Sequence, residues 1–183
     1  MLEELLEKLK KMPENWQRRL FFMAILTRAL EGENVQPIVV GEHAVEFYTL
    51  GGYATADIDI IVTDSPAVDR ILKGCGFIKE GRHWYSEELD IAIEAPSSRL
   101  AGDSSRITVV EVEGLPVYLI GIEDIIIDRL NAYVHWKSER DGEWAEEMLA
   151  LHLDRIDGKY LRQKAMEEDV LNALQEMLER IGQ

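Results

Sequence analysis

Short apolar runs alternate with amphipathic stretches along this chain, and glycine or proline separates them. Residues 38–40 form an apolar run that stops at Gly41, and residues 42–49 place apolar side chains at helical spacing. A Gly-Gly pair then breaks the pattern before a second apolar run, residues 57–62, which contains two aspartates. This order predicts a strand, a helix, a loop and a second strand.

The segments on either side of this unit extend the pattern. Leucines at helical spacing predict a helix over residues 1–11, and Pro13 is expected to open a second helix that ends near Gly32. After the second strand, Ser65 and Pro66 form a strong helix start, and this helix should end at Gly74. The remaining segments are predicted to be two short strands, a third strand, a hairpin and three helices, at residues 77–79, 82–85, 89–93, 107–120, 121–137, 144–152 and 160–181.

These elements together predict an α+β fold with a mixed β-sheet and flanking helices. We expect N-terminal helices over residues 1–34, an α/β core over 35–121 and a C-terminal helical region over 122–183. No internal repeat and no low-complexity linker separates the three parts, so they are expected to pack as one body.

The formal net charge of −15 narrows the range of partners. Affinity for long DNA or RNA comes largely from basic side chains that displace counterions, so this charge disfavours long nucleic acid as a ligand. A nucleotide is compatible with the charge if a divalent metal ion neutralises it locally. The acidic surface is also suited to a basic protein partner.

The sequence contains no apolar run of membrane-spanning length and therefore predicts no membrane segment. The first residues lack the apolar centre and the cleavage site of a secretory signal. Cys75 is the single cysteine, which agrees with a reducing compartment. We therefore expect a soluble, cytoplasmic protein.

The candidate chemistry begins with Asp57 and Asp59. Residues two apart in a strand share a face, so these two carboxylates should lie side by side while Ile58 faces the other way. Asp90 lies among apolar residues of the later predicted strand and is the candidate for a third acid. Three carboxylates can hold a pair of magnesium ions that activate a hydroxyl and stabilise a leaving phosphate.

Gly41 supplies the second feature of the candidate site. A glycine between a strand and a helix allows close backbone approach, and the free N–H groups of the helix start suit a phosphate group. Metal ions at the aspartates and phosphate at the helix start would together hold a nucleoside triphosphate.

This combination resembles the DNA polymerase beta-like nucleotidyltransferase superfamily. The resemblance lies in a strand that ends in glycine, a helix, the Asp57-Ile58-Asp59 strand and a later acid in Leu89-Asp90-Ile91. The loop Tyr53–Asp59 is similar to that of the minimal nucleotidyltransferases of toxin–antitoxin and abortive-infection systems. Residues 123–130 resemble the start of the helical tail in small members of that group.

The resemblance implies a nucleotidyltransferase-like fold and a set of site residues. Asp57 and Asp59 would coordinate two Mg²⁺ ions, with Mn²⁺ as a substitute, and Asp90 would assist at the ion that binds the attacking hydroxyl. Gly41 would lie under the triphosphate, and Glu42 and Thr55 would border the nucleotide.

Glu42 departs from the family pattern, which usually has serine or glycine directly after the glycine. A carboxylate in the first helical turn is favourable against the helix dipole, but it competes with a phosphate for the same amides. Either the Glu42 side chain points aside and only backbone amides serve the nucleotide, or triphosphate binding has been weakened or lost.

Two functional hypotheses follow from different protein classes, and a nucleotide sensor that binds without transfer is a further possibility. The first is a magnesium-dependent nucleotidyltransferase that moves a nucleoside monophosphate from a triphosphate to an unknown hydroxyl acceptor. The alternative is a catalytically weakened, nucleotidyltransferase-like binding module, antitoxin-like, that acts through a protein partner. The four histidines show no metal-ligand spacing, so structural roles are predicted for them.

Overall fold

The computed structural model describes residues 2–182 of the chain. Its strands form one mixed sheet in the order β3-β4-β5-β2-β1-β7-β6, with helices packed around it, which confirms the predicted α+β fold. The strands are β1 (Ile38–Val40), β2 (Asp57–Ile61), β3 (Ile78–Glu80), β4 (His83–Ser86), β5 (Ile91–Ser97), β6 (Thr108–Val112) and β7 (Leu115–Leu119). The α-helices are α1 (Leu2–Lys10), α2 (Trp16–Leu30), α3 (Gly41–Tyr48), α4 (Ser65–Gly74), α5 (Ile122–Trp136), α6 (Glu139–His152), α7 (Gly158–Glu167) and α8 (Leu171–Ile181), and two 3₁₀ turns are η1 (Glu31–Glu33) and η2 (Ser104–Arg106).

The centre of the sheet combines parallel and antiparallel pairing. Strand β2 pairs antiparallel with β1 and parallel with β5, and β1 also pairs parallel with β7. The remaining neighbours, β3 with β4, β4 with β5 and β6 with β7, are antiparallel. Because β2 and β5 run the same way, residues separated by more than thirty positions lie beside each other in equivalent orientation.

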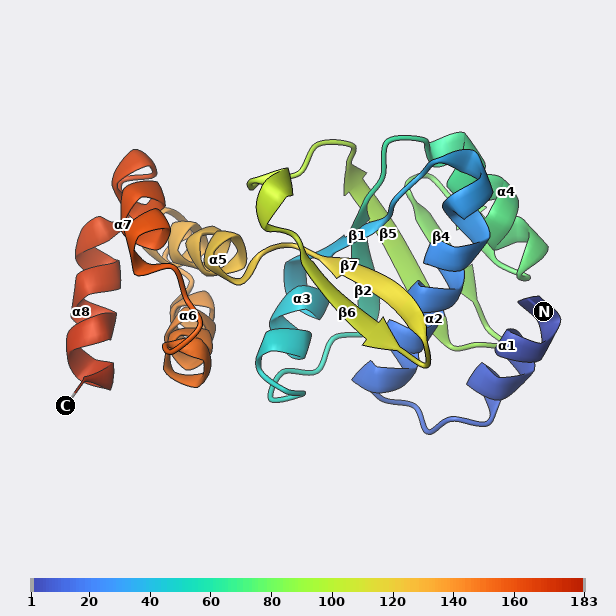
Figure 1. The fold of residues 1–183 in the computed structure, drawn as a ribbon, viewed down its shortest axis with the longest axis horizontal. Coiled ribbons are helices and arrows are strands. Elements are labelled where there is room, and N and C mark those ends of the chain that lie inside the picture. The colour runs from blue at the N-terminus through green and yellow to red at the C-terminus, as the bar shows by residue number, and fades with distance from the viewer. Residues whose placement is uncertain (1, 183) are drawn as a thin grey trace.

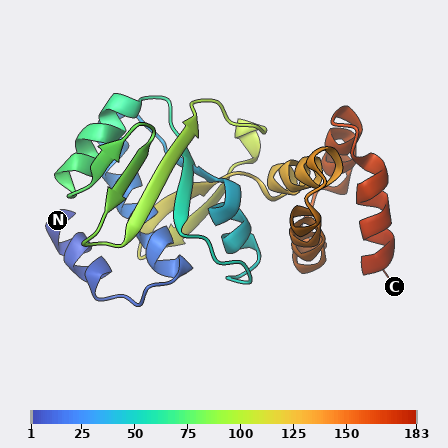
Figure 2. The same cartoon turned by 180° about the vertical axis from the view of Figure 1, so that it is seen from behind.

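The two faces of strands β4, β5 and β2 differ in polarity. One face is apolar and fully buried, and it includes Trp84, Ile93 and Ile58. The residues between them point to the other face and are more exposed, because successive side chains of a strand point to opposite faces. Figure 2 shows the N-terminal helices behind these strands, so the second face lies open on the viewer's side.

Helix α2 is buried along most of its length beneath the sheet. It begins at Trp16 rather than at Pro13 as predicted, because the Asn15 side chain caps the helix by accepting from the Arg18 amide at 3.0 Å. Its aromatic and aliphatic side chains fill the main core together with β1, β2 and β7.

The C-terminal region contains four helices where the sequence predicts three. The predicted helix over residues 160–181 is divided into α7 and α8, because Asp169 adopts a left-handed backbone with φ of 58°. Helix α6 begins at Glu139, earlier than predicted, because Ser138 caps its first turn. Figure 1 shows α5 to α8 gathered beyond one end of the sheet.

Specific hydrogen bonds join this helical region to the α/β core. Nε2 of His152 donates to the Tyr48 carbonyl at 2.7 Å, and the Arg106 guanidinium donates to the Asp157 carboxylate at 2.9 Å. Within the region, the Asp157 amide donates to the buried Glu123 carboxylate at 2.8 Å. Among residues 2–182, no helix has both the length and the apolar content needed to cross a membrane.

Candidate active site

Asp57 and Asp59 lie on the open face of β2, and the sheet register places a third carboxylate next to them. Asp59 pairs with Glu94 on β5 and with Val40 on β1, and Asp57 pairs with Ala92. Paired residues of neighbouring strands point to the same face, so Asp57, Asp59 and Glu94 share one side of the sheet. We call these three residues the carboxylate row.

Gly41 lies directly against this row, at the point where β1 becomes α3. Its φ of +58° is a left-handed conformation that favours glycine. A Cβ atom at this position would lie 2.3 Å from Oδ2 of Asp59, so any side chain here would displace the carboxylate. The glycine is therefore required both by its backbone conformation and by the close approach of Asp59.

Asp59 is held in an environment that disfavours its negative charge. Burial and the Glu94 carboxylate raise the pKa of Asp59 to about 6, and the charges of Glu42 and Asp57 act in the same direction. The backbone amide of Glu42 donates to Asp59 and opposes the shift. One amide in the first turn of α3 is thus already used by a protein carboxylate.

The Glu42 side chain binds a tyrosine instead of the helix amides. Oε2 of Glu42 accepts from the Tyr53 hydroxyl at 2.7 Å. The Tyr53 ring lies 4.0 Å from the Trp144 ring between centroids, and the Arg140 guanidinium lies 4.7 Å from the Tyr53 centroid. Burial raises the pKa of Tyr53 to about 12, and Glu42 adds to the shift, so this phenol stays protonated and remains a donor to Glu42.

Asp90, the third acid predicted from the sequence, lies outside the strand. The predicted strand over residues 89–93 is shifted to Ile91–Ser97, and Asp90 is exposed in the preceding turn with φ of 48°. Glu94 lies four residues further along, about 13 Å at the rise of an extended strand. The assignment of Asp90 to the metal site stays a prediction, and Glu94 is the candidate that the structure adds.

Sequence reasoning missed Glu94 because the parallel pairing of β2 with β5 is not a local property. One signal was present, since Glu94 follows Ala92 at the strand period of two and alternates with the buried Ile91 and Ile93. Thr55, predicted to border the nucleotide, lies in the loop before β2, where its hydroxyl donates to the Asp57 carbonyl at 3.3 Å.

Glu94 already has basic neighbours. Nε of Arg82 lies 2.6 Å from its Oε1, and Nδ1 of His83 lies 3.8 Å from its Oε2. Among the described residues, no group of three histidine, cysteine, aspartate or glutamate side chains is arranged as a metal site. The donor chemistry nevertheless fits a hard divalent cation, because all three members of the carboxylate row offer oxygen.

One cavity opens beside Asp59, and a second cavity adjoins the first. The first, of about 310 Å³, is lined by Gly41 and Asp59 together with Arg99 and Asp128. The second, of about 400 Å³, shares Arg99 and Asp128 with the first and extends along α5 and α7. Its other polar lining residues are Asp124, Asn131, Lys164 and Glu168.

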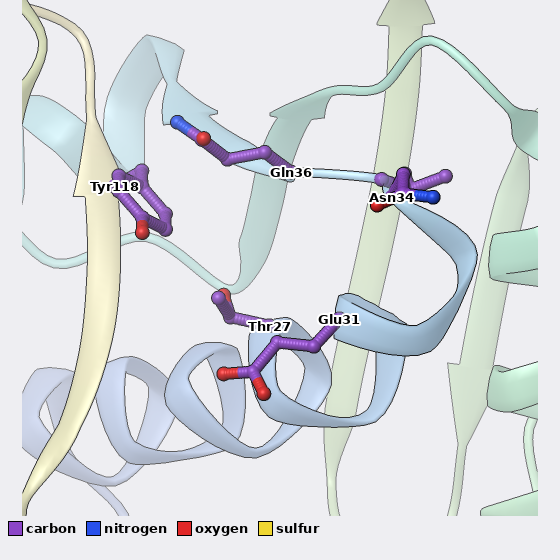
Figure 3. Close-up of a pocket in the computed structure, with 6 residues that line it drawn as sticks. Thr27, Glu31, Asn34, Gln36 and Tyr118 are labelled. Atoms are coloured by element: carbon purple, nitrogen blue, oxygen red, sulfur yellow. The ribbon is translucent and has the colours of Figure 1, made fainter.

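A further cavity of about 290 Å³ lies at the opposite end of β1 (Figure 3). Its lining includes Thr27, Gln36 and Tyr118, and the buried Thr27 hydroxyl has no hydrogen-bond partner in the described structure. None of the site residues predicted from the sequence lines this cavity.

Comparison with known proteins relates the chain to solved structures only. No family model matches the sequence, and no curated protein matches it. An antigenic nucleotidyltransferase-like protein from Paracoccidioides brasiliensis superposes with a TM-score of 0.64 at 15% identity, covering 92% of this chain and 89% of the other. The chain has a nucleotidyltransferase-like fold.

A second solved structure supports the same fold. ANT(2")-Ia, crystallised in complex with adenylyl-2"-tobramycin, superposes with a TM-score of 0.57 at 13% identity. The alignment covers 82% of this chain and 97% of that protein. The resemblance to a nucleotidyltransferase therefore holds at the level of the fold, and the link to toxin–antitoxin systems stays a prediction.

Proposed function

We propose that this protein is a metal-dependent nucleotidyltransferase. The observation that carries the proposal is the carboxylate row, which lies on an open sheet face against Gly41 and the start of α3, in a nucleotidyltransferase-like fold. In the proposed reaction an acceptor oxygen bonds to the α-phosphorus of a nucleoside triphosphate. The bond between the α- and β-phosphates breaks, pyrophosphate leaves, and the acceptor hydroxyl loses its proton.

The residues of the chain divide this task. Asp57, Asp59 and Glu94 would hold two Mg²⁺ ions, which would neutralise phosphate charge and favour an ionised acceptor hydroxyl. Gly41 lies against Asp59, and its backbone would let the phosphates approach close to the row. The raised pKa of Asp59 supports this assignment, because nearby carboxylates without a counterion are a common feature of functional sites.

We infer that the acceptor is a small hydroxyl-bearing molecule. ANT(2")-Ia was crystallised with adenylyl-2"-tobramycin, an adenylylated small molecule. The cavity of about 400 Å³, which shares Arg99 and Asp128 with the cavity beside Asp59, has the size of a small-ligand site. The carboxylates of Asp124, Asp128 and Glu168 line that cavity and favour an acceptor with amino groups. The net charge makes an RNA end the least favourable acceptor.

Transfer from labelled nucleoside triphosphates tests the proposal. The protein is incubated with Mg²⁺, each of the four ribonucleotides labelled at the α-phosphate, and a panel of amino sugars, polyols and proteins. Label should pass to an acceptor in the presence of Mg²⁺ but not of EDTA, and Asp59→Asn should abolish it. Equal labelling by the wild type and Asp59→Asn would overturn the proposed mechanism.

One observation favours the alternative function, a binding module without catalysis. Arg82 already pairs with Glu94, and no three-residue metal group is arranged among the described residues. In that case the acidic surface would bind a basic protein partner. Calorimetry separates the two functions, because Mg²⁺-dependent triphosphate binding is expected for the enzyme and its absence for the module.

A further inference from the structure

Arg99 lies where the cavity beside Asp59 meets the adjoining cavity. It lines the cavity that contains Gly41 and Asp59, and it also lines the cavity that extends along α5 and α7. Its side chain is exposed, and within the described residues its guanidinium makes no ion pair and no hydrogen bond.

An arginine without a partner is unusual in this setting, because the chain has a net charge of −15. Lys164, the other basic residue that lines these cavities, is paired with Glu167 at 2.8 Å. Asp128, the carboxylate that shares both cavities with Arg99, is paired with Arg129. Arg99 is therefore the lining cation that remains available for an anionic ligand.

The backbone on both sides of Arg99 is anchored, although its side chain is free. The Arg99 amide donates to Oγ of Ser97 at 3.0 Å, and the Asp103 amide donates to the buried Asp124 carboxylate at 2.9 Å. Gly102 lies so close to Asp124 that a Cβ atom there would be 2.6 Å from Oδ2. The loop thus presents Arg99 to the cavity from a fixed position.

The other arginine next to the carboxylate row, Arg82, is already paired with Glu94 at 2.6 Å, so it is less available to a phosphate group. The Glu42 amide at the start of α3 is bound to Asp59, and the Glu42 side chain brings an additional carboxylate. A triphosphate would carry about four further negative charges into this region, where Asp57 and Asp59 also require metal ions to offset their charge. A guanidinium binds phosphate oxygens in pairs and keeps its charge at any physiological pH.

We propose that Arg99 binds the β- and γ-phosphates of the nucleotide and selects triphosphates over monophosphates. This inference rests on the proposed function, because it assigns a residue to the donor of that reaction. In this arrangement Arg99 replaces the positive potential that Glu42 removes from the helix start, and it also orients the departing pyrophosphate.

Binding measurements on the full chain test the role of Arg99. Calorimetry with Mg²⁺ compares the wild type, Arg99→Gln and Arg99→Lys for three probes: a non-hydrolysable ATP analogue, AMP and inorganic triphosphate. Arg155→Gln is the matched control, because Arg155 is exposed in the turn between α6 and α7. Arg99→Gln should lower the affinity for the ATP analogue and for inorganic triphosphate by about tenfold or more. It should lower the affinity for AMP by less than about twofold, and Arg99→Lys should have intermediate affinities.

The outcomes separate this inference from the proposed function. Equal weakening of all three probes, unchanged affinity in Arg99→Gln, or failure of the wild type to bind either triphosphate probe would overturn the role of Arg99. Triphosphate binding that depends on Arg99, without transfer to any acceptor, would support the inference and contradict the proposed transferase activity. A circular-dichroism melt of each variant excludes loss of folding as the cause.

Discussion

Two regions of this molecule contain carboxylates of low exposure and differ in how the negative charge is compensated. The first is a buried ion cluster between α2 and α3, formed by Arg19, His43 and Glu46. Both oxygens of Glu46 accept from the Arg19 guanidinium, at 2.6 and 2.7 Å, and Nδ1 of His43 lies 3.0 Å from one of them. Burial acts to raise the pKa of Glu46, but these hydrogen bonds outweigh it, and the pKa is lowered.

The carboxylate row is the second region, and it has no comparable compensation at its centre. Asp59 is surrounded by other carboxylates and has a raised pKa, whereas Glu46 is surrounded by donors and has a lowered one. An acid that is fully paired inside the protein stabilises one arrangement of helices. An acid that is left among like charges gains most from a ligand of opposite charge, and so it indicates a cation site.

The largest expected effect is the loss of catalysis when the central acid of the carboxylate row is replaced. Asp59→Asn removes the central negative charge of the row while keeping its shape, and the loss of metal ligation should reduce transfer by about 10³-fold or more. The unfolding free energy should not fall, because a charge held at raised pKa is removed. Labelled transfer and urea denaturation measure the two effects, and a variant that loses stability together with activity would contradict the distinction.

In the buried ion cluster the corresponding change should affect stability instead. Glu46→Gln leaves the Arg19 charge buried without its carboxylate partner, which should lower the unfolding free energy by about 3–5 kcal/mol. Glu31→Gln is the matched control, because the exposed Glu31 pair with Arg28 should contribute no more than about 1 kcal/mol. Urea denaturation of both variants measures the difference, and similar losses would show that the cluster is not a structural unit.

A third comparison tests whether Glu94 or Asp90 is the third metal ligand. Glu94→Gln should reduce transfer by about 10²-fold, because it removes one metal ligand worth several kcal/mol. Asp90→Asn changes the acid predicted from the sequence, and it should leave transfer within about twofold, since surface changes away from a site are nearly neutral. The reverse result, measured by the same labelled assay, would assign the third metal ligand to Asp90.

The smallest expected effect is the pH dependence that Asp59 gives to stability. Its pKa is about 6 in the folded chain and about 3.9 unfolded, so the folded state binds more protons between these values. The unfolding free energy contributed by Asp59 is therefore highest below about pH 4 and decreases as the pH rises through 6. Denaturation curves of the wild type and Asp59→Asn should converge in acid and diverge above pH 6.

His43 also contributes to the pH dependence of stability, and its contribution changes with pH in the opposite direction to that of Asp59. Burial lowers the pKa of His43, so its contribution is lost as the pH falls through the unfolded value of about 6.5. His43 is retained in Asp59→Asn, and the difference between the two curves isolates Asp59. Added Mg²⁺ should stabilise the wild type above pH 6 and not the variant, and identical curves for both proteins would exclude Asp59 as the titrating group.

Local patterns in the sequence were sufficient to predict how Asp57, Asp59 and Gly41 are placed in their strand and turn. The alternation of strand residues placed Asp57 and Asp59 on one face, and Gly41 marked the change from strand to helix, because both depend on the backbone within a few residues. The α+β fold with a mixed sheet also followed from the order of elements. Element boundaries were less accurate where caps and left-handed residues decided them, as at Asn15 and Asp169.

Only the tertiary structure decided which groups surround those aspartates. Glu94 lies beside Asp59 because β2 and β5 pair in parallel. The Tyr53 hydroxyl donates to Glu42, and Arg99 lines the cavity from a separate loop. Strand order and register are determined by how buried faces pack over the whole sheet, so residues far apart in sequence carry no local mark of being neighbours. The sequence by itself therefore determined two of the carboxylates, while folding determined the third, the neighbours that raise the pKa of Asp59, and the free arginine beside them.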